Sequence, residues 1–158
     1  MPALKICVSV ALALWVGGLS LFVGTVIPVS FRSFKKEEAG RFLEVLFPAV
    51  DRWCLVWGAA AAGALFLLFR SRHLAPASLA LELPVGLMFL LTLYVARVLH
   101  PEVHELKRKI NLPEFEGSAH QQTMKFAFDR LYKVSVRLHG LLLLLGWFSL
   151  GLVPSFLR

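Results

Sequence analysis

Hydrophobic residues gather in four long blocks along the chain, and clusters of charge separate the blocks. Uncharged runs cover 26 residues at 6–31, 17 residues at 53–69 and 20 residues at 138–157. A further block at 74–96 carries one charged residue, Glu82. A helix that crosses a bilayer needs about 20 mostly apolar residues, so the pattern predicts four membrane spans.

The fold class that follows is all-α. We expect one integral membrane domain over residues 1–158, built as a four-helix bundle with amphipathic cytoplasmic segments. Composition agrees, because 58% of the residues are hydrophobic and the mean hydropathy is +0.70, whereas a soluble domain averages about 45–50% apolar residues. The expected spans are about 6–31, 49–69, 76–99 and 134–155.

Two segments outside these spans show helical periodicity with one apolar face. In residues 34–48, Phe42, Val45 and Leu46 recur at three- and four-residue spacing, which is typical of an amphipathic helix. We expect this helix to lie along the cytoplasmic interface before the second span. Helical spacing resumes over residues 119–132, so the fourth helix should begin in the cytosol before it enters the membrane.

The basic residues are distributed unequally between the two sides of the predicted bundle. The connections between spans 1 and 2 and between spans 3 and 4 lie on the side that holds 13 of the 17 Lys and Arg residues, and the termini lie with the other 4. Cytoplasmic loops collect Lys and Arg, so both termini should lie outside the cytoplasm. This asymmetry accounts for the net charge of +7 without a nucleic-acid partner. The expected partners are the bilayer and its anionic lipids, which a basic face attracts.

Small residues recur in three of the four spans. The second span carries "GAAAAGA", in which Gly58 pairs with Ala62 and Ala59 with Gly63 at small-xxx-small spacing. Such faces let helix backbones approach closely. We expect Gly58, Ala62 and Gly63 to face another helix, either within a tight bundle or in a homo-oligomer.

Charged residues at the cytoplasmic ends of the spans should fall at one membrane level. The planar guanidinium of Arg97 suits a shared carboxylate or a bound anion, and Asp51 and Glu44 are the available acids. We therefore predict a polar ring that either fixes the helix register or binds a small anion or lipid headgroup. Its expected members are Asp51, Arg52, Arg97 and Arg137.

Histidines near the same level suggest an alternative chemistry. Pro101 can occupy the first turn of a new helix, and His100 and His104 would then share one face. His139 is a candidate third ligand, and a metal needs three or four ligands of matched type. His100 and His139 could also serve as axial haem ligands. No cofactor is expected, because histidines at an interface commonly have their polar ends in water, but metal and haem stay open as alternatives.

Glu82 is the one charge inside the third block. It lies six residues from Pro76, about 9 Å deep at roughly 1.5 Å per residue, where a carboxylate is costly if it faces lipid. One interpretation is a rim carboxylate that Arg70 or Arg72 reaches. The other is a protonatable group on a transport path. Nucleophile-elbow, phosphate-loop, dinucleotide and zinc-protease motifs are absent from the sequence, which disfavours an enzyme.

Four short stretches resemble a known family. They are "WVGG" at 15–18, "EEAGRFLEVLFP" at 37–48, "LHPEVHELK" at 99–107 and "FDRLYKVSVRLHGLLLLLG" at 128–146. In this order they are similar to the bacterial membrane family called domain of unknown function 4149, which includes the vertebrate transmembrane protein 205 group. The resemblance implies a four-span protein of the bacterial inner membrane and no settled activity. The run Leu141–Leu145 departs from the small or polar residues that the family tends to place there, which weakens a site at that turn.

We therefore favour a non-enzymatic integral membrane protein that binds lipid headgroups or a small anion at the polar ring. The first alternative is a small transporter or metal-handling protein that uses Glu82, His100, His104 and His139. The second alternative is a haem-dependent membrane oxidoreductase.

Overall fold

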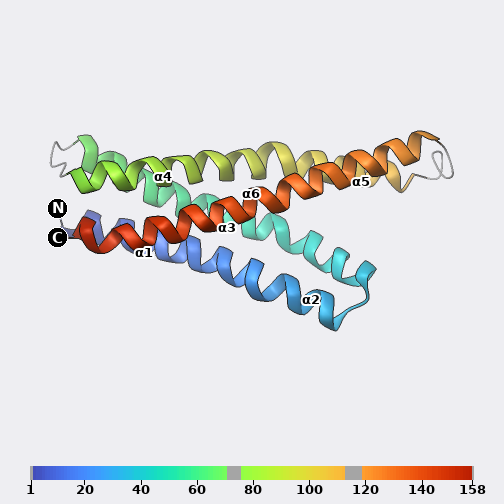
Figure 1. Cartoon of the computed structure of the whole chain (residues 1–158), viewed down its shortest axis with the longest axis horizontal. Coiled ribbons are helices and arrows are strands. Elements are labelled where there is room, and N and C mark those ends of the chain that lie inside the picture. The colour runs from blue at the N-terminus through green and yellow to red at the C-terminus, as the bar shows by residue number, and fades with distance from the viewer. Residues whose placement is uncertain (1, 71–75, 113–118, 158) are drawn as a thin grey trace.

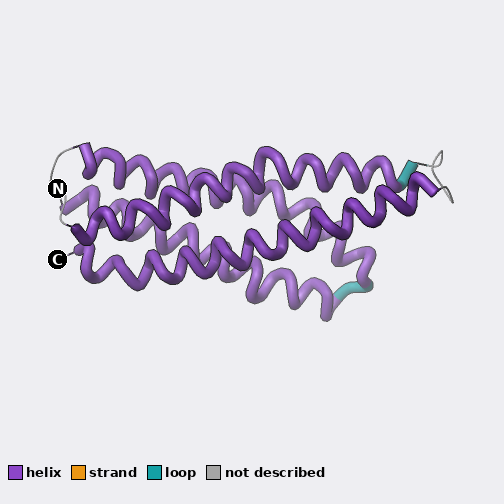
Figure 2. Tube along the Cα trace, turned by 45° about the horizontal axis from the view of Figure 1, so that its top comes forward, coloured by secondary structure: helices purple, strands orange, loops and turns teal. Residues whose placement is uncertain are grey.

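The structure, a computed structural model, describes residues 2–70, 76–112 and 119–157, and no strand occurs within these ranges. Figure 2 shows helix along nearly all of the described chain, with short loop segments between α2 and α3 and after α5. The elements in chain order are α1 (Pro2–Leu21), the π-helical segment η1 (Phe22–Val26), α2 (Ile27–Ser33), α3 (Lys36–Arg70), α4 (Pro76–Tyr94), the π-helical segment η2 (Val95–Leu99), α5 (His100–Ile110) and α6 (Ala119–Leu157).

These elements join into four rods that are long and apolar enough to cross a membrane: Ala3–Ser33, Glu38–Arg70, Ala80–Ile110 and His120–Ser155. The prediction of an all-α, four-span integral membrane protein is therefore confirmed. Large apolar side chains such as Leu83 (79% exposed) and Leu144 (72% exposed) point away from the bundle, as lipid-facing residues do. Figure 1 shows that α1 begins and α6 ends at the same end of the bundle, and that α2 and α5 lie at the other end.

The amphipathic segment before the second span is continuous with that span. Residues 36–70 form one helix, α3, which is about 52 Å long at roughly 1.5 Å per residue. The predicted helix before the second span is therefore confirmed, and it continues into that span without a break. In the part of α3 before Pro48, Ala39 and Leu43 are buried, whereas Phe42 and Val45 are exposed. Because the helix is continuous, Leu43 lies on the same face as Cys54. This face also carries the small and aliphatic residues that contact the other rods, so it is the face that is buried.

Close backbone packing in the core occurs at some of the predicted glycines. A Cβ atom added to Gly58 would lie 3.0 Å from Phe89 and 3.1 Å from the ring of Trp15, which is fully buried. The prediction for Gly58 is confirmed. A Cβ atom on Gly63 would meet nothing within 4 Å, so the prediction that Gly63 packs against another helix of the bundle is wrong. Gly146 provides an approach that the pattern did not single out, because a Cβ there would lie 2.7 Å from Val16.

Both π-helical segments directly precede a helix whose second residue is proline. Pro28 lies in the first turn of α2 after η1, and Pro101 lies in the first turn of α5 after η2. A proline inside a helix removes one N–H donor and crowds the carbonyl four residues before it, and a wider π turn relieves that crowding. Pro101 lies in the first turn of α5, as the sequence allowed, but the rod does not restart there, because η2 joins α4 to α5 without a break.

Candidate metal centre

Three polar side chains from three different rods meet inside the bundle near its α2–α5 end. Asp51 lies on α3, His100 is the first residue of α5, and His139 lies on α6. His100 is 8% exposed and His139 is 9% exposed. Close packing of α3 and α6 on the rest of the bundle holds these side chains at one level. Polar groups buried at this depth are expected to be paired or to hold a ligand.

The π turn of η2 accounts for the burial of His100. Leu99 and His100 are consecutive in sequence, yet both are buried. A π turn holds one residue more than an α turn, so it shifts the following residues around the helix axis. His100 therefore lies on the same buried face of the rod as Val95 and Leu99. Such turns are frequent at functional sites.

His100 connects a carboxylate and a hydroxyl. Its Nδ1 atom lies 2.5 Å from Oδ2 of Asp51, and this geometry fits an N–H that donates to a carboxylate. Its Nε2 atom lies 3.4 Å from Oγ of Ser135. Carboxylate, imidazole and hydroxyl thus follow one another as in acyl-transfer triads. Ser135 lies within the continuous helix α6, however, where backbone N–H groups bond within the helix and provide no oxyanion site.

His139 is held in a defined orientation. Its Nδ1 atom lies 2.8 Å from the carbonyl oxygen of Ser135. A carbonyl only accepts, so Nδ1 carries the hydrogen, and the neutral ring keeps a lone pair on Nε2. The rings of His100 and His139 are almost parallel, with centroids 5.6 Å apart. Phe47 lies edge-on to His100 at 5.2 Å and covers the pair from α3.

Asp51, His100 and His139 have the geometry of an incomplete metal site. Each offers one ligand atom, and these atoms all lie within 4.8 Å of one another. Ligand atoms of a tetrahedral zinc ion, each about 2.0–2.2 Å from the metal, lie roughly 3.3–3.6 Å apart. Small side-chain rotations would bring the wider pairs of ligand atoms together and would move Asp51 Oδ2 away from His100 Nδ1, which now lie 2.5 Å apart. Two imidazoles and one carboxylate form a donor set that first-row divalent metals commonly use.

Comparison with known families now adds to this geometry. A family model described as a domain of unknown function, DUF4149, matches residues 10–111. The chain belongs to this family. A search of curated proteins and a search of solved structures each give no match.

The DUF4149 match covers two of the three metal-ligand candidates. It includes Asp51 and His100 and ends before α6, which supplies His139 and Ser135. The resemblance that we predicted from short stretches is confirmed over residues 10–111. The similarity noted in residues 128–146 lies beyond the matched segment.

The predicted polar ring of this DUF4149 protein is not assembled as expected. Asp51 contacts His100, and within the described chain it forms no ion pair with Arg97 or Arg137. Arg52, Arg97 and Arg137 are exposed, and the Arg52 side chain donates to the carbonyl oxygen of Pro48. The predicted pairing of Asp51 with Arg97 is therefore wrong. The physical reason is that the π turn places His100 inward beside Asp51, while Arg97 lies on the exposed side of the rod.

The other two predicted residues lie apart from Asp51. His104 is one turn beyond His100 and faces Glu44, with Nδ1 and Oε1 3.4 Å apart. Glu82 lies in α4, near the opposite end of its rod, and its Oε1 atom is buried without a hydrogen-bond partner among the described residues. Arg70, one of its two predicted partners, is exposed and forms no ion pair with Glu82, and Arg72 lies outside the described residues.

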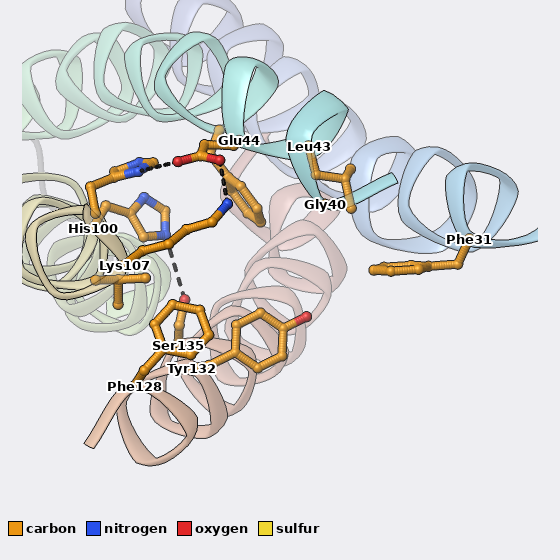
Figure 3. Close-up of a pocket in the computed structure, with 12 residues that line it drawn as sticks. Phe31, Gly40, Leu43, Glu44, His100, Lys107, Phe128, Tyr132 and Ser135 are labelled. Carbon is orange, nitrogen blue, oxygen red and sulfur yellow. Dashed lines mark hydrogen bonds and ion pairs between the residues drawn. The ribbon is translucent and has the colours of Figure 1, made fainter. Parts of the chain in front are cut away.

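An inner pocket reaches one of the metal-ligand candidates, His100, and a larger outer cavity adjoins this pocket. The inner pocket, about 140 Å³, is lined partly by His100, Ser135 and Phe47. The outer cavity, about 1200 Å³, is lined partly by Arg41 and Lys125. Figure 3 shows the inner pocket, with His100, Lys107 and Glu44 grouped on one side and Ser135 below them. The two cavities share lining residues, namely Gly40, Glu44, His104, Lys107 and Phe128.

Sequence reasoning did not single out Ser135, Phe47 and Glu44 as parts of one site. The four-residue spacing of Ser135 and His139 was a usable signal, because a histidine can bond to the carbonyl one turn before it in a helix. Phe47 carried no such signal, and Glu44 was predicted only as an acid available to the polar ring. Both enter the site because α3 continues through the segment that we predicted to be interfacial.

Proposed function

We propose that this DUF4149 protein binds a divalent first-row transition-metal ion, such as Zn²⁺, within the membrane bundle. The ligands are Asp51, His100 and His139. The observation that carries the proposal is the convergence of three ligand atoms within 4.8 Å from three separate rods. A buried carboxylate and two buried imidazoles are costly to collect in a bilayer, and a bound cation would compensate for that cost.

The hydrogen bonds around the proposed ligands support this chemistry. Because Nδ1 of His139 donates its hydrogen to the Ser135 carbonyl, the lone pair on Nε2 is available to bind a metal. Metal-bound histidines characteristically make such a hydrogen bond with the nitrogen that does not bind the metal. The metal would replace the proton between His100 and Asp51. His100 would then carry its hydrogen on Nε2, where the Ser135 hydroxyl lies.

Three protein ligands leave at least one coordination position open. Closed structural zinc sites use four protein ligands, whereas sites that act on or transfer something keep a position for water or a substrate. His100 and Ser135 also line the inner pocket, so this pocket is a route by which a small ligand approaches the site. The proposal adopts the metal-handling alternative in preference to the anion-binding ring, because the ring residues point apart.

We further propose that the α2–α5 end of the bundle faces the cytoplasm and that both termini lie outside it, in the bacterial inner membrane. The distribution of 13 basic residues against 4 supports this orientation. The metal site would then lie on the cytoplasmic half of the bundle, at the level where the sequence places Asp51 and His100.

Metal binding is measured on the purified full chain in detergent. After treatment with a chelator and removal of the chelator, titration calorimetry with Zn²⁺ should give one site per chain, and elemental analysis should agree. Asp51→Asn and His139→Gln should each weaken zinc binding by more than about 100-fold, because loss of a supporting hydrogen bond alone costs about 10- to 100-fold.

His104→Gln is the matched control, since it removes a histidine one turn from His100 that lies outside the cluster. Zinc binding in this variant should stay within about threefold of the parent protein, given that its side chain faces Glu44. Equal losses in His104→Gln and His139→Gln, or no stoichiometric binding in the parent, would overturn the proposal. A haem Soret band in the visible spectrum of the purified protein would show that the site binds haem and not a single metal ion.

A further inference from the structure

We propose that the outer cavity is a binding site for the phosphate-bearing headgroup of an anionic phospholipid. The site lies between α3, α5 and α6, and its cationic side chains are Arg41, Lys107, Arg108 and Lys125. This inference does not rest on the metal. It assigns a ligand class to the outer cavity, which the metal proposal leaves unused, and the two proposals share only the inner pocket.

The charge of the outer cavity is unbalanced. Four cationic side chains line it, and Glu44 is the one acidic side chain among its lining residues. Glu44 is already paired with Lys107 and lies near His104. Arg108 has a partner in Glu105, at 3.1 Å.

Arg41 and Lys125 supply the cationic charge that remains for a ligand. Neither forms an ion pair with an acidic side chain among the described residues. They lie on α3 and α6, respectively, so an anion between them would bridge two rods. A phosphate group with several acceptor oxygens suits an arginine fork and a lysine together.

The surface beside this cavity is apolar and aromatic. The inner pocket is lined mainly by aliphatic and aromatic side chains, among them Leu43, Val103 and Phe128. Phe31 and Tyr132 are 43% and 44% exposed, and Figure 3 shows them on the side of the pocket away from His100 and Lys107. A cationic cavity that continues into an apolar pocket matches an amphiphile with an anionic head.

Size distinguishes the roles of the two cavities. A cavity of about 150 Å³ holds a benzene-sized group, and the inner pocket has about 140 Å³. It therefore takes only a short apolar part of the ligand. The remainder of an acyl chain would leave past Phe31 and Tyr132 toward the lipid. The outer cavity, about 1200 Å³, has room for a phosphate headgroup and its water.

The test uses full-length protein in detergent, titrated separately with phosphatidylglycerol, with phosphatidylcholine of the same chains and with inorganic phosphate. Bound lipid is counted by native mass spectrometry. Phosphatidylglycerol should bind at least about tenfold more tightly than phosphatidylcholine, and inorganic phosphate should not displace it at equal concentration. Equal binding of both lipids would show an apolar groove only. Displacement by inorganic phosphate would show a small-anion site, and either result overturns the proposal.

A charge-matched pair of double variants tests the residues. Arg41→Gln with Lys125→Gln should weaken phosphatidylglycerol binding by roughly 30-fold, because each basic residue near an anionic headgroup contributes about 1 kcal/mol. Arg97→Gln with Arg137→Gln removes the same charge from exposed positions outside the cavity and should change binding less than about threefold. Equal losses in both double variants would mean general attraction to anionic lipid and would overturn the site. Zinc stoichiometry in the first double variant should equal that of the parent, which separates this outcome from failure of the metal proposal.

Discussion

The Nδ1 atom of His100 lies 2.5 Å from Oδ2 of Asp51, although the two residues are 49 positions apart in the sequence. Both side chains are largely shielded, with 10% and 15% of their side-chain surfaces exposed. A carboxylate buried in this way depends on its partner, because an unpaired buried charge loses its hydration without compensation. This contact joins α3 to the start of α5.

Removal of His100 should therefore destabilise the bundle. His100→Ala leaves Asp51 without its partner, and breaking a buried pair costs about 3–5 kcal/mol. His104→Ala, at a side chain that is 38% exposed, should cost under about 1 kcal/mol. Unfolding in mixed detergent micelles measures both values. Similar costs for the two variants would show that the Asp51–His100 contact contributes little to stability.

Gly58 and Gly63 form a second matched comparison. Gly58→Leu would force a side chain into Trp15 and Phe89, at positions where a Cβ already lies 3.0–3.1 Å away, and overpacking costs about 1–3 kcal/mol or more. Gly63→Leu should change thermal stability little, because its surroundings are open in the bundle. A loss of stability at Gly63 together with a change in oligomeric state, measured by light scattering, would instead place Gly63 in a contact between chains.

Ser135→Ala separates the two roles of Ser135. The variant keeps the backbone carbonyl that orients His139 and loses the hydroxyl 3.4 Å from His100. Zinc affinity should fall by about tenfold, at the low end of the effect of supporting hydrogen bonds, and stoichiometry should stay at one. Complete loss of zinc binding would mean that the hydroxyl is itself a ligand.

Zinc binding should weaken as pH falls. Imidazole and carboxylate ligands bind a metal only when deprotonated, so protons compete with the ion. Affinity should decrease steadily from about pH 7.5 to about pH 5.5, the interval in which histidines ordinarily become charged. Titration calorimetry in buffers of different ionisation enthalpy would also count the protons released. A pH-independent affinity would contradict imidazole ligation.

Membrane orientation can be tested with single cysteines in a variant that lacks Cys7 and Cys54. Gln122→Cys, at an exposed position in the first turn of α6, should react with an impermeant maleimide only after the membrane is opened. Ala3→Cys, near the other end of the bundle, should react from outside intact cells. The reverse pattern would invert the proposed topology and place the metal site on the outer half.

The sequence by itself determined the helical class, the number of spans and the existence of candidate ligands. Long uncharged blocks specify spans because the bilayer requires internal hydrogen bonding and an apolar surface of fixed length. Histidines at 100 and 139 and the acid at 51 were visible as residues. The place of Pro101 in the first turn of α5 was also predictable, because proline has a defined preference for a first helical turn.

Tertiary structure alone decided which of these residues meet. Asp51 pairs with His100 and not with Arg97 because the π turn of η2 changes which residues face inward. No local sequence pattern predicts this effect. Helix faces in a membrane protein are also hard to assign from hydrophobicity, because lipid and protein interior are both apolar. For this reason the apolar pattern of Phe42 and Val45 did not reveal that Ala39 and Leu43 are the buried residues of this segment. For the same reason Gly63 resembled Gly58, although of these two only Gly58 packs against a neighbouring rod.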